Sequence, residues 1–188
     1  MRRFRGLGLL FCWVLAGAAQ AAPEASPSAH DTALEALREL RAQVRVRVGE
    51  DGGERVMVTT DSLWRGGDDG LRHLAQIQGL YKLRIGGSVS DAGLVHLAGL
   101  AELEALDLHL PEVTDAGVRH LAGLVGLERL NLTYTQTSDR GLRWLEDMTR
   151  LKWLGLVYTQ VTVAGVERLR KVLPNTTIEG DFKRQRSD

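Results

Sequence analysis

The sequence has little cysteine, few aromatic residues and no excess of charge of either sign. Cys12 is the only cysteine among 188 residues, and it lies in an apolar segment near the N-terminus. Aromatic residues make up 5% of the chain, so aliphatic side chains must supply most of any core. Basic and acidic residues number 24 each, which argues against a nucleic-acid-binding protein that works by bulk positive charge.

The first 21 residues have the pattern of a secretory signal peptide. A basic MRRFR segment precedes an apolar run of 14 residues, and small residues follow it. The run is shorter than the roughly 18 residues of a spanning helix, so we predict cleavage, export to the periplasm or outside the cell, and no membrane span afterwards. A retained anchor is the alternative. Cleavage after residue 21 removes Cys12 and leaves 21 basic and 24 acidic side chains, a net charge of −3 without any disulfide.

A repeat of 24 residues dominates the rest of the chain. Similar segments begin at Val89, Val113, Thr137 and Val161, after a shorter unit from Gly66, and the units from Val89 and Val113 agree at 13 of 24 positions. Each unit has apolar residues spaced by three, which predicts a short helix, followed by an LxxLxL pattern that predicts a strand. Neither element can bury its apolar face alone, so successive units must stack.

Polar residues and glycines recur with the same period. We expect hydroxyl groups to cap the helices at four positions, Ser90, Thr114, Ser138 and Thr162. Aspartates follow the first three, where the positive end of a helix favours a carboxylate, and Val163 follows the fourth. Glycines recur inside the first helical turn, which suggests that neighbouring units approach too closely there for a Cβ.

The TDAGVRHLAGL segment and the LxxLxL pattern resemble those of exported bacterial leucine-rich repeat proteins, similar to the GALA and cysteine-containing subclasses. The resemblance covers residues 66–181. It implies an α/β leucine-rich repeat solenoid, a right-handed βα superhelix with parallel strands on the concave face and short helices on the convex face. The position that the family usually fills with Asn or Cys holds Ser88, Pro111, Thr135 and Thr159, so we expect Pro111 to interrupt this ladder in one coil.

The predicted organisation has five parts. Residues 1–21 form the signal peptide, 22–30 a flexible linker, 31–65 an N-terminal cap, 66–181 the repeats and 182–188 a charged tail. In the cap, Asp31 begins an amphipathic helix, and alternating valines around a DGG turn predict a hairpin. At the other end, Leu173 to Ile178 imitates LxxLxL and predicts a final strand.

Strand residues between the leucines are expected to face outward and to align in lateral rows. One predicted row is Lys82, Ala105, Arg129, Trp153 and Asn175. The next is Arg84, Asp107, Asn131, Gly155 and Thr177, and the third is Gly86, His109, Thr133, Val157 and Glu179. Leu110, Tyr134 and Tyr158 stand at the strand ends.

Trp, Tyr and Arg dominate interface energetics, and these rows concentrate them. We therefore predict a protein-binding patch made of Asp107, His109, Arg129, Asn131, Tyr134, Trp153 and Tyr158. The alternative is that the aromatic rings only shield the last coils.

Enzymatic and metal-binding functions find little support. His73, His96 and His120 share one register, but the repeat itself explains them, and no carboxylate completes a metal site. There is no GxSxG, HExxH or phosphate-binding glycine loop, and no hydroxyl nucleophile accompanies Asp107 and His109. We predict an exported binding module without cofactor, metal, enzymatic activity or nucleic-acid partner. It recognises a protein, or a cell-envelope glycan; the alternative is a structural subunit of an envelope assembly.

Overall fold

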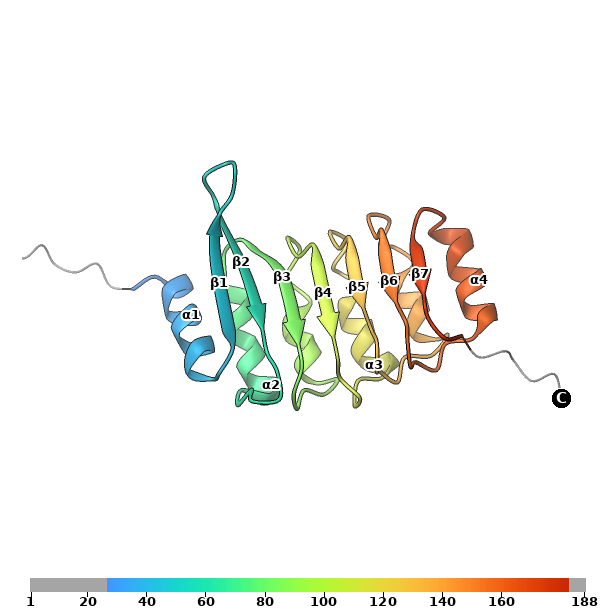
Figure 1. Ribbon diagram of the computed structural model, residues 1–188, viewed down its shortest axis with the longest axis horizontal. Coiled ribbons are helices and arrows are strands. Elements are labelled where there is room, and N and C mark those ends of the chain that lie inside the picture. The colour runs from blue at the N-terminus through green and yellow to red at the C-terminus, as the bar shows by residue number, and fades with distance from the viewer. Residues whose placement is uncertain (1–26, 183–188) are drawn as a thin grey trace, which may run out of the picture.

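The computed structural model describes residues 27–182, which form one elongated array of stacked coils (Figure 1). All seven strands belong to a single sheet, in the order of the chain. They are β1 (Gln43–Val48), β2 (Glu54–Thr59), β3 (Leu80–Ile85), β4 (Ala105–Leu108), β5 (Arg129–Asn131), β6 (Trp153–Gly155) and β7 (Thr177–Glu179). The β1–β2 pair is antiparallel and the other five pairs are parallel. The predicted signal peptide and residues 183–188 lie outside the described residues.

Short helical segments form a second layer behind the sheet (Figure 1). They are α1 (Ala29–Glu39), α2 (Gly67–Gly70), η1 (Leu71–Gln76), η2 (Gly93–Leu97), α3 (Asp115–Val118), η3 (Arg119–Leu121), η4 (Gly141–Leu145) and α4 (Val163–Val172), where η denotes a 3₁₀-helix. In the inner coils these segments are shorter than the predicted helices of eight to ten residues. The spacing of three that suggested a helix equals the 3₁₀ period of about three residues per turn, so a 3₁₀ turn keeps all three apolar residues on one face.

Both sets of apolar residues meet in one continuous core. Leu106, Leu130 and Leu154 are lateral partners on β4, β5 and β6, and they are 2%, 0% and 0% exposed. The residues spaced by three, such as Leu94 and Leu97, are equally buried from the helical side. The stacking of equivalent 24-residue turns is therefore confirmed.

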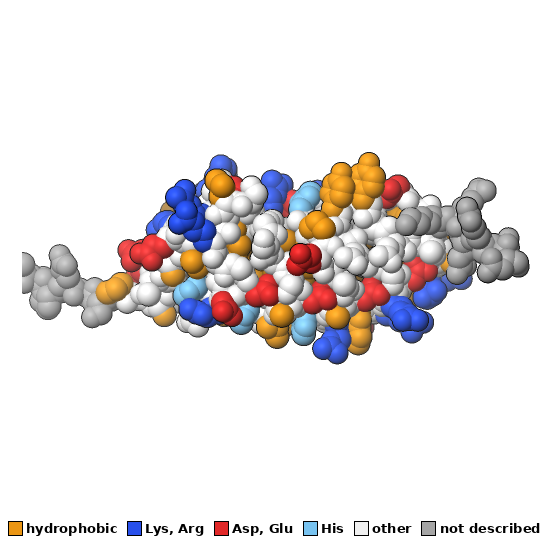
Figure 2. Space-filling model, turned by 90° about the horizontal axis from the view of Figure 1, so that it is seen from below, with side chains coloured by type: hydrophobic (Ala, Val, Ile, Leu, Met, Phe, Trp, Pro, Cys, Tyr) orange, Lys and Arg blue, Asp and Glu red, His pale blue; other side chains and the backbone are white. Residues whose placement is uncertain are grey.

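An aspartate–hydroxyl ladder runs along one edge of the stack. In each coil the aspartate accepts two hydrogen bonds from the next coil, at 2.7–2.8 Å from the backbone N–H and at 2.6–2.7 Å from the hydroxyl of its Ser or Thr. The pairs are Asp68–Ser90, Asp91–Thr114, Asp115–Ser138 and Asp139–Thr162, and we call them the Asp ladder. Acidic side chains follow one another along the array in Figure 2. The sequence correctly predicted the hydroxyl caps, but not that the aspartates bind the neighbouring coil.

The recurring glycines lie against this ladder. A Cβ on Gly93, Gly117, Gly141 or Gly165 would collide with the ladder aspartate of the preceding coil. The prediction of a close approach between coils is confirmed, and the group that approaches is the carboxylate.

The first helix begins two residues earlier than the sequence suggested. Ser28 caps α1, its Oγ accepting from the Asp31 N–H at 3.1 Å, while the Asp31 carboxylate accepts from the Ser28 N–H at 3.2 Å. Asp31 is thus the third helical residue of a capping box rather than the first. Ala29 and His30, assigned above to the linker, belong to this helix.

The lateral register of the last strand differs from the prediction by two residues. Trp153 pairs with Thr177 and Gly155 with Glu179, not with Asn175 and Thr177. The 24-residue period continues because Ile178 lies beside Leu154. Leu173 caps the C-terminus of α4 instead of beginning a strand motif, which is why the apparent LxxLxL pattern misled.

No helix within residues 27–182 is long and apolar enough to cross a membrane.

Candidate functional site

The outward positions of β4, β5 and β6 place four of the predicted site residues in two neighbouring rows. Arg129 pairs laterally with Trp153, and Asp107 pairs with Asn131 one step further along the strands. We call the seven predicted residues, Asp107, His109, Arg129, Asn131, Tyr134, Trp153 and Tyr158, the strand-face patch.

Asp107 is the polar centre of the patch. Its Oδ2 lies 2.8 Å from Arg84 Nε, while its Oδ1 accepts from Asn131 Nδ2 at 2.9 Å and lies 3.0 Å from His109 Nε2. The side chain is only 17% exposed. Because both oxygens are engaged, Asp107 orients its neighbours and is not placed as a free general base.

Trp153 lies flat beside this polar centre, and a glycine makes its position available. The Arg129 guanidinium sits 4.9 Å from the centroid of the Trp153 ring, within the range of a cation–π interaction. A Cβ on Gly155 would approach Trp153 Cη2 to 2.5 Å and Asn131 Oδ1 to 2.7 Å. Gly155 therefore belongs to the site, although its role did not follow from the sequence.

Tyr134 and Tyr158 form an exposed aromatic pair at the strand ends. Their rings stack with centroids 4.7 Å apart and an interplanar angle of 22°, and the two residues are 51% and 59% exposed. The His109 ring lies 6.4 Å from that of Tyr134. Pro111, Gln136 and Asp181 line a shallow hollow beside the two tyrosines.

Both tyrosines have left-handed backbone conformations. Their φ angles are +63° and +55°, a region that costs a non-glycine residue about 1–3 kcal/mol. The Tyr134 N–H donates to Val157 O at 3.0 Å, and the Tyr158 N–H donates to Asp181 Oδ1 at 2.7 Å. These bonds hold two exposed rings in a conformation that the backbone alone disfavours.

Leu110 occupies the equivalent place in the preceding coil, but it is fully buried and does not extend the aromatic pair. Its φ is not positive. Pro111 follows it and restricts it to extended conformations, which excludes the tyrosine-type turn. The expectation that Leu110 stands with the tyrosines at the surface is therefore wrong.

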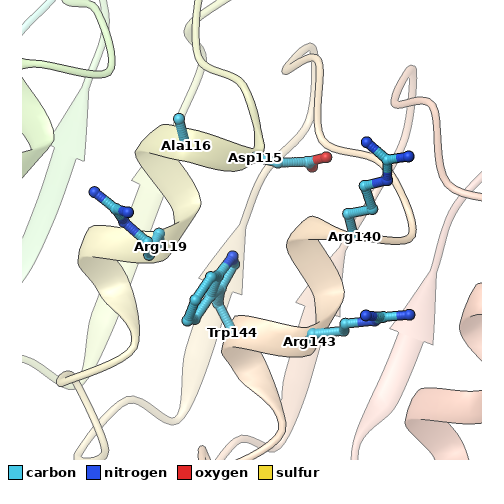
Figure 3. A pocket seen from close by; sticks show the side chains of 6 residues that line it. All are labelled: Asp115, Ala116, Arg119, Arg140, Arg143 and Trp144. Carbon is cyan, nitrogen blue, oxygen red and sulfur yellow. The ribbon is translucent and has the colours of Figure 1, made fainter.

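The helical face carries a second hollow, around Trp144 (Figure 3). Trp144 is 43% exposed and stands between Arg119 and Arg143, whose guanidinium groups point to opposite sides. Asp115 also lines the hollow, but its two oxygens are engaged by Ser138 in the Asp ladder. The charged groups do not converge on a common point.

The histidines of the helical face do not form a metal site with acidic neighbours. His73, His96 and His120 are each half-buried in successive coils. Among residues 27–182, no group of three or more His, Cys, Asp or Glu side chains is arranged to hold a metal ion.

The most extensive structural match is the leucine-rich repeat ectodomain of the receptor kinase SOBIR1 from Arabidopsis thaliana. It aligns with 82% of this chain and 91% of its own length, with a TM-score of 0.51 and 16% identity. The fold is a leucine-rich repeat solenoid. At this identity the match establishes the fold alone.

Two internalins of Listeria monocytogenes also align with parts of the solenoid. Internalin C2 matches with a TM-score of 0.46 and 21% identity, and internalin F with 0.37 and 18%. Each alignment covers 61% of this chain, which spans 49% of internalin C2 and 46% of internalin F. No family model matches the sequence, and neither does any curated protein.

Proposed function

We propose that this solenoid is an exported binding module that recognises a protein through the strand-face patch. The observation that carries the proposal is the stacked pair of Tyr134 and Tyr158, both more than half exposed and both held at positive φ. A costly backbone conformation that displays apolar rings to solvent is typical of a recognition site.

The neighbouring groups support the same function. Arg129 and Trp153 provide a cationic and an aromatic surface already in contact with each other, so binding requires little loss of side-chain freedom. The hydrogen bonds around Asp107 fix the polar floor between the two aromatic groups. The saturated state of that carboxylate favours binding over catalysis, and we propose no enzymatic activity.

Export is proposed from the N-terminal segment, which lies outside the described residues. N-terminal sequencing of the mature protein and fractionation of the cells that express it would test this part. A chain that begins at Met1 and stays in the cytoplasm would contradict it.

A structural subunit is the second candidate, and the open edge of the sheet favours it. Within residues 27–182, β1 pairs only with β2, and Val48 on β1 is 75% exposed. An unpaired edge strand can add a further strand from another molecule. A concentration-dependent change from monomer to oligomer in light scattering would support this role, whereas a monomer at all concentrations would exclude self-assembly.

The binding face is tested by photo-crosslinking in the cells that express the protein. A photoreactive residue replaces Tyr158, and in a control it replaces Val95, which is 48% exposed on the helical side. We expect a defined protein adduct from position 158 and none from position 95. Adducts from position 95 alone, or from neither position, would contradict the assignment of the face.

A further inference from the structure

The outward positions of β1, β2 and β3 carry five basic side chains and no acidic one. They are Arg45, Arg47, Arg55, Lys82 and Arg84. In Figure 2, Lys and Arg side chains gather along the upper margin toward the N-terminal end, and hydrophobic side chains along the same margin toward the C-terminal end. The predicted mature chain has a net charge of −3, so this concentration of positive charge is local.

Two of the five cations are already neutralised. Arg55 donates two hydrogen bonds to Glu104, at 3.1 and 2.8 Å, and its guanidinium lies 4.2 Å from the centroid of the Tyr81 ring. The hydrogen bonds with Glu104 raise the pKa of Arg55. Arg84 is bound to Asp107 at 2.8 Å.

The other three cations have no ion pair within the part of the chain that the structure describes. Arg45, Arg47 and Lys82 line one hollow, together with Met57 and Tyr81. Three cations around a small hollow repel one another, so an anion placed there would relieve repulsion as well as gain attraction.

The strand register places these charges in a regular row. Arg45 pairs laterally with Met57, Met57 with Lys82, and Lys82 with Ala105. Ala105 in turn pairs with Arg129, which has no ion pair within residues 27–182 either. Arg45, Lys82 and Arg129 therefore stand on alternate strands, with the uncharged Met57 and Ala105 between them. We call these three residues the cation row.

Alternate strands of a sheet are about 9.6 Å apart. A polyproline II segment completes one turn of three residues in about 9.3 Å and returns every third side chain to the same face. We propose that the cation row binds an extended acidic segment of a protein partner, laid across the strands with an acidic residue at every third position. This inference rests on the proposed function, since it names the chemistry of the partner for the same strand face.

The intervening residues fit this arrangement. Met57 and Ala105 offer uncharged contacts between the cations, where the residues between successive acids would lie. At the end of the row Arg129 contacts Trp153, so the acidic segment would lead directly into the strand-face patch.

Peptides of equal composition test the spacing. Fluorescence anisotropy at low salt would compare the purified protein's affinity for (Glu-Pro-Pro)₅, for a peptide with the same residues but all glutamates at one end, and for (Gln-Pro-Pro)₅. We expect the regularly spaced peptide to bind at least about fivefold more tightly than the clustered one, because only it engages all three cations without strain. The glutamine peptide should bind weakest. Equal affinities for the spaced and clustered peptides would overturn the proposal.

Charge reversals test the residues. Arg45→Glu and Lys82→Glu should each weaken binding of the spaced peptide by about fivefold or more. Arg72→Glu and Arg143→Glu, at exposed positions of the helical side, make the same change of charge and should alter affinity less than twofold. Lys82→Gln serves if a reversal disturbs folding, as judged by circular dichroism. Equal losses in the helical-side variants would overturn the proposal.

Two further outcomes separate this inference from the proposed function. A sulfated oligosaccharide that binds more tightly than every peptide, with the same dependence on Lys82, would replace the acidic protein segment by a glycan. A partner that crosslinks at position 158, combined with no preference for the spaced peptide, would leave the proposed function standing and remove the cation row from it.

Discussion

The Asp ladder and the strand face are built from the same coils, but they differ in how strictly the coils repeat. Along the ladder, four successive pairs use the same two hydrogen bonds, with donor–acceptor distances that agree within 0.1 Å for each bond. Across the strand face, one lateral row changes from Lys82 to Ala105, Arg129, Trp153 and Thr177.

Repetition therefore indicates groups that hold one coil to the next, and variation indicates groups free to serve another purpose. A residue needed for stacking must be present in every coil that has a successor. A residue that contacts a partner needs to be present only where the partner lies. This distinction predicts that substitutions at the ladder lower stability, whereas substitutions on the strand face lower binding.

The largest loss of stability is expected from a glycine beside the ladder. In Gly117→Ala the new Cβ would collide with the Asp91 carboxylate and lie 3.0 Å from Leu94 Cδ1. We expect the free energy of unfolding to fall by about 2–3 kcal/mol, measured by urea denaturation. Gly99→Ala is the control, because nothing lies within 4 Å of its Cβ position and it should change stability by less than about 1 kcal/mol. Equal effects of the two substitutions would show that the ladder is not tightly packed.

Removal of a ladder carboxylate should have the next largest effect. Asp91→Ala deletes the acceptor of two hydrogen bonds and leaves the Thr114 N–H and hydroxyl without it. Bonds of this kind predict a loss of about 1.5–3 kcal/mol in urea denaturation. The exposed Asp69, one position after a ladder aspartate, provides the control Asp69→Ala, which we expect to stay within about 0.5 kcal/mol. A loss from Asp69→Ala as large as that from Asp91→Ala would assign the effect to net charge.

Substitution on the strand face should show the opposite pattern. Tyr158→Ala removes one ring of the stacked pair, and we expect capture of the crosslinked partner to weaken by about tenfold or more. Unfolding should be affected by only about 1 kcal/mol, because the ring is 59% exposed and its main contact is Tyr134. Val125→Ala, 50% exposed, should change neither property. Unchanged capture by the Tyr158 variant would return the tyrosines to the alternative role of shielding the last coils.

Much of the fold was predictable because the period itself carries the information. Once the coils align every 24 residues, the lateral neighbours of Leu130 or Arg129 follow without further reasoning. The error at the C-terminus arose where this rule was abandoned, since Leu173, Thr176 and Ile178 imitate LxxLxL two residues out of phase. The 24-residue period, which places Ile178 beside Leu154, was the more reliable signal.

The candidate site was only partly predictable for two physical reasons. Ring orientations depend on three-dimensional space that sequence spacing does not describe, as the place that Gly155 leaves for Trp153 shows. The cation row begins on β1, which lies outside the repeat and pairs antiparallel, so no period relates Arg45 to Lys82. The Asp ladder did leave a signal, because an aspartate follows the capping hydroxyl in the coils that begin at Ser90, Thr114 and Ser138 but not after Thr162.

That exception supplies the most sensitive test of the comparison, because the smallest effect is expected there. Val163 holds the ladder position of the last coil, is 37% exposed, and has no following coil with an N–H and hydroxyl to bind. Val163→Asp should therefore leave the free energy of unfolding within about 0.5 kcal/mol, with a slight gain from the carboxylate at the positive end of α4. If the ladder aspartates mainly stabilised their own helices, Val163→Asp would instead stabilise the protein by as much as Asp91→Ala destabilises it. Urea denaturation of the two variants side by side distinguishes a bond between coils from a bond within one.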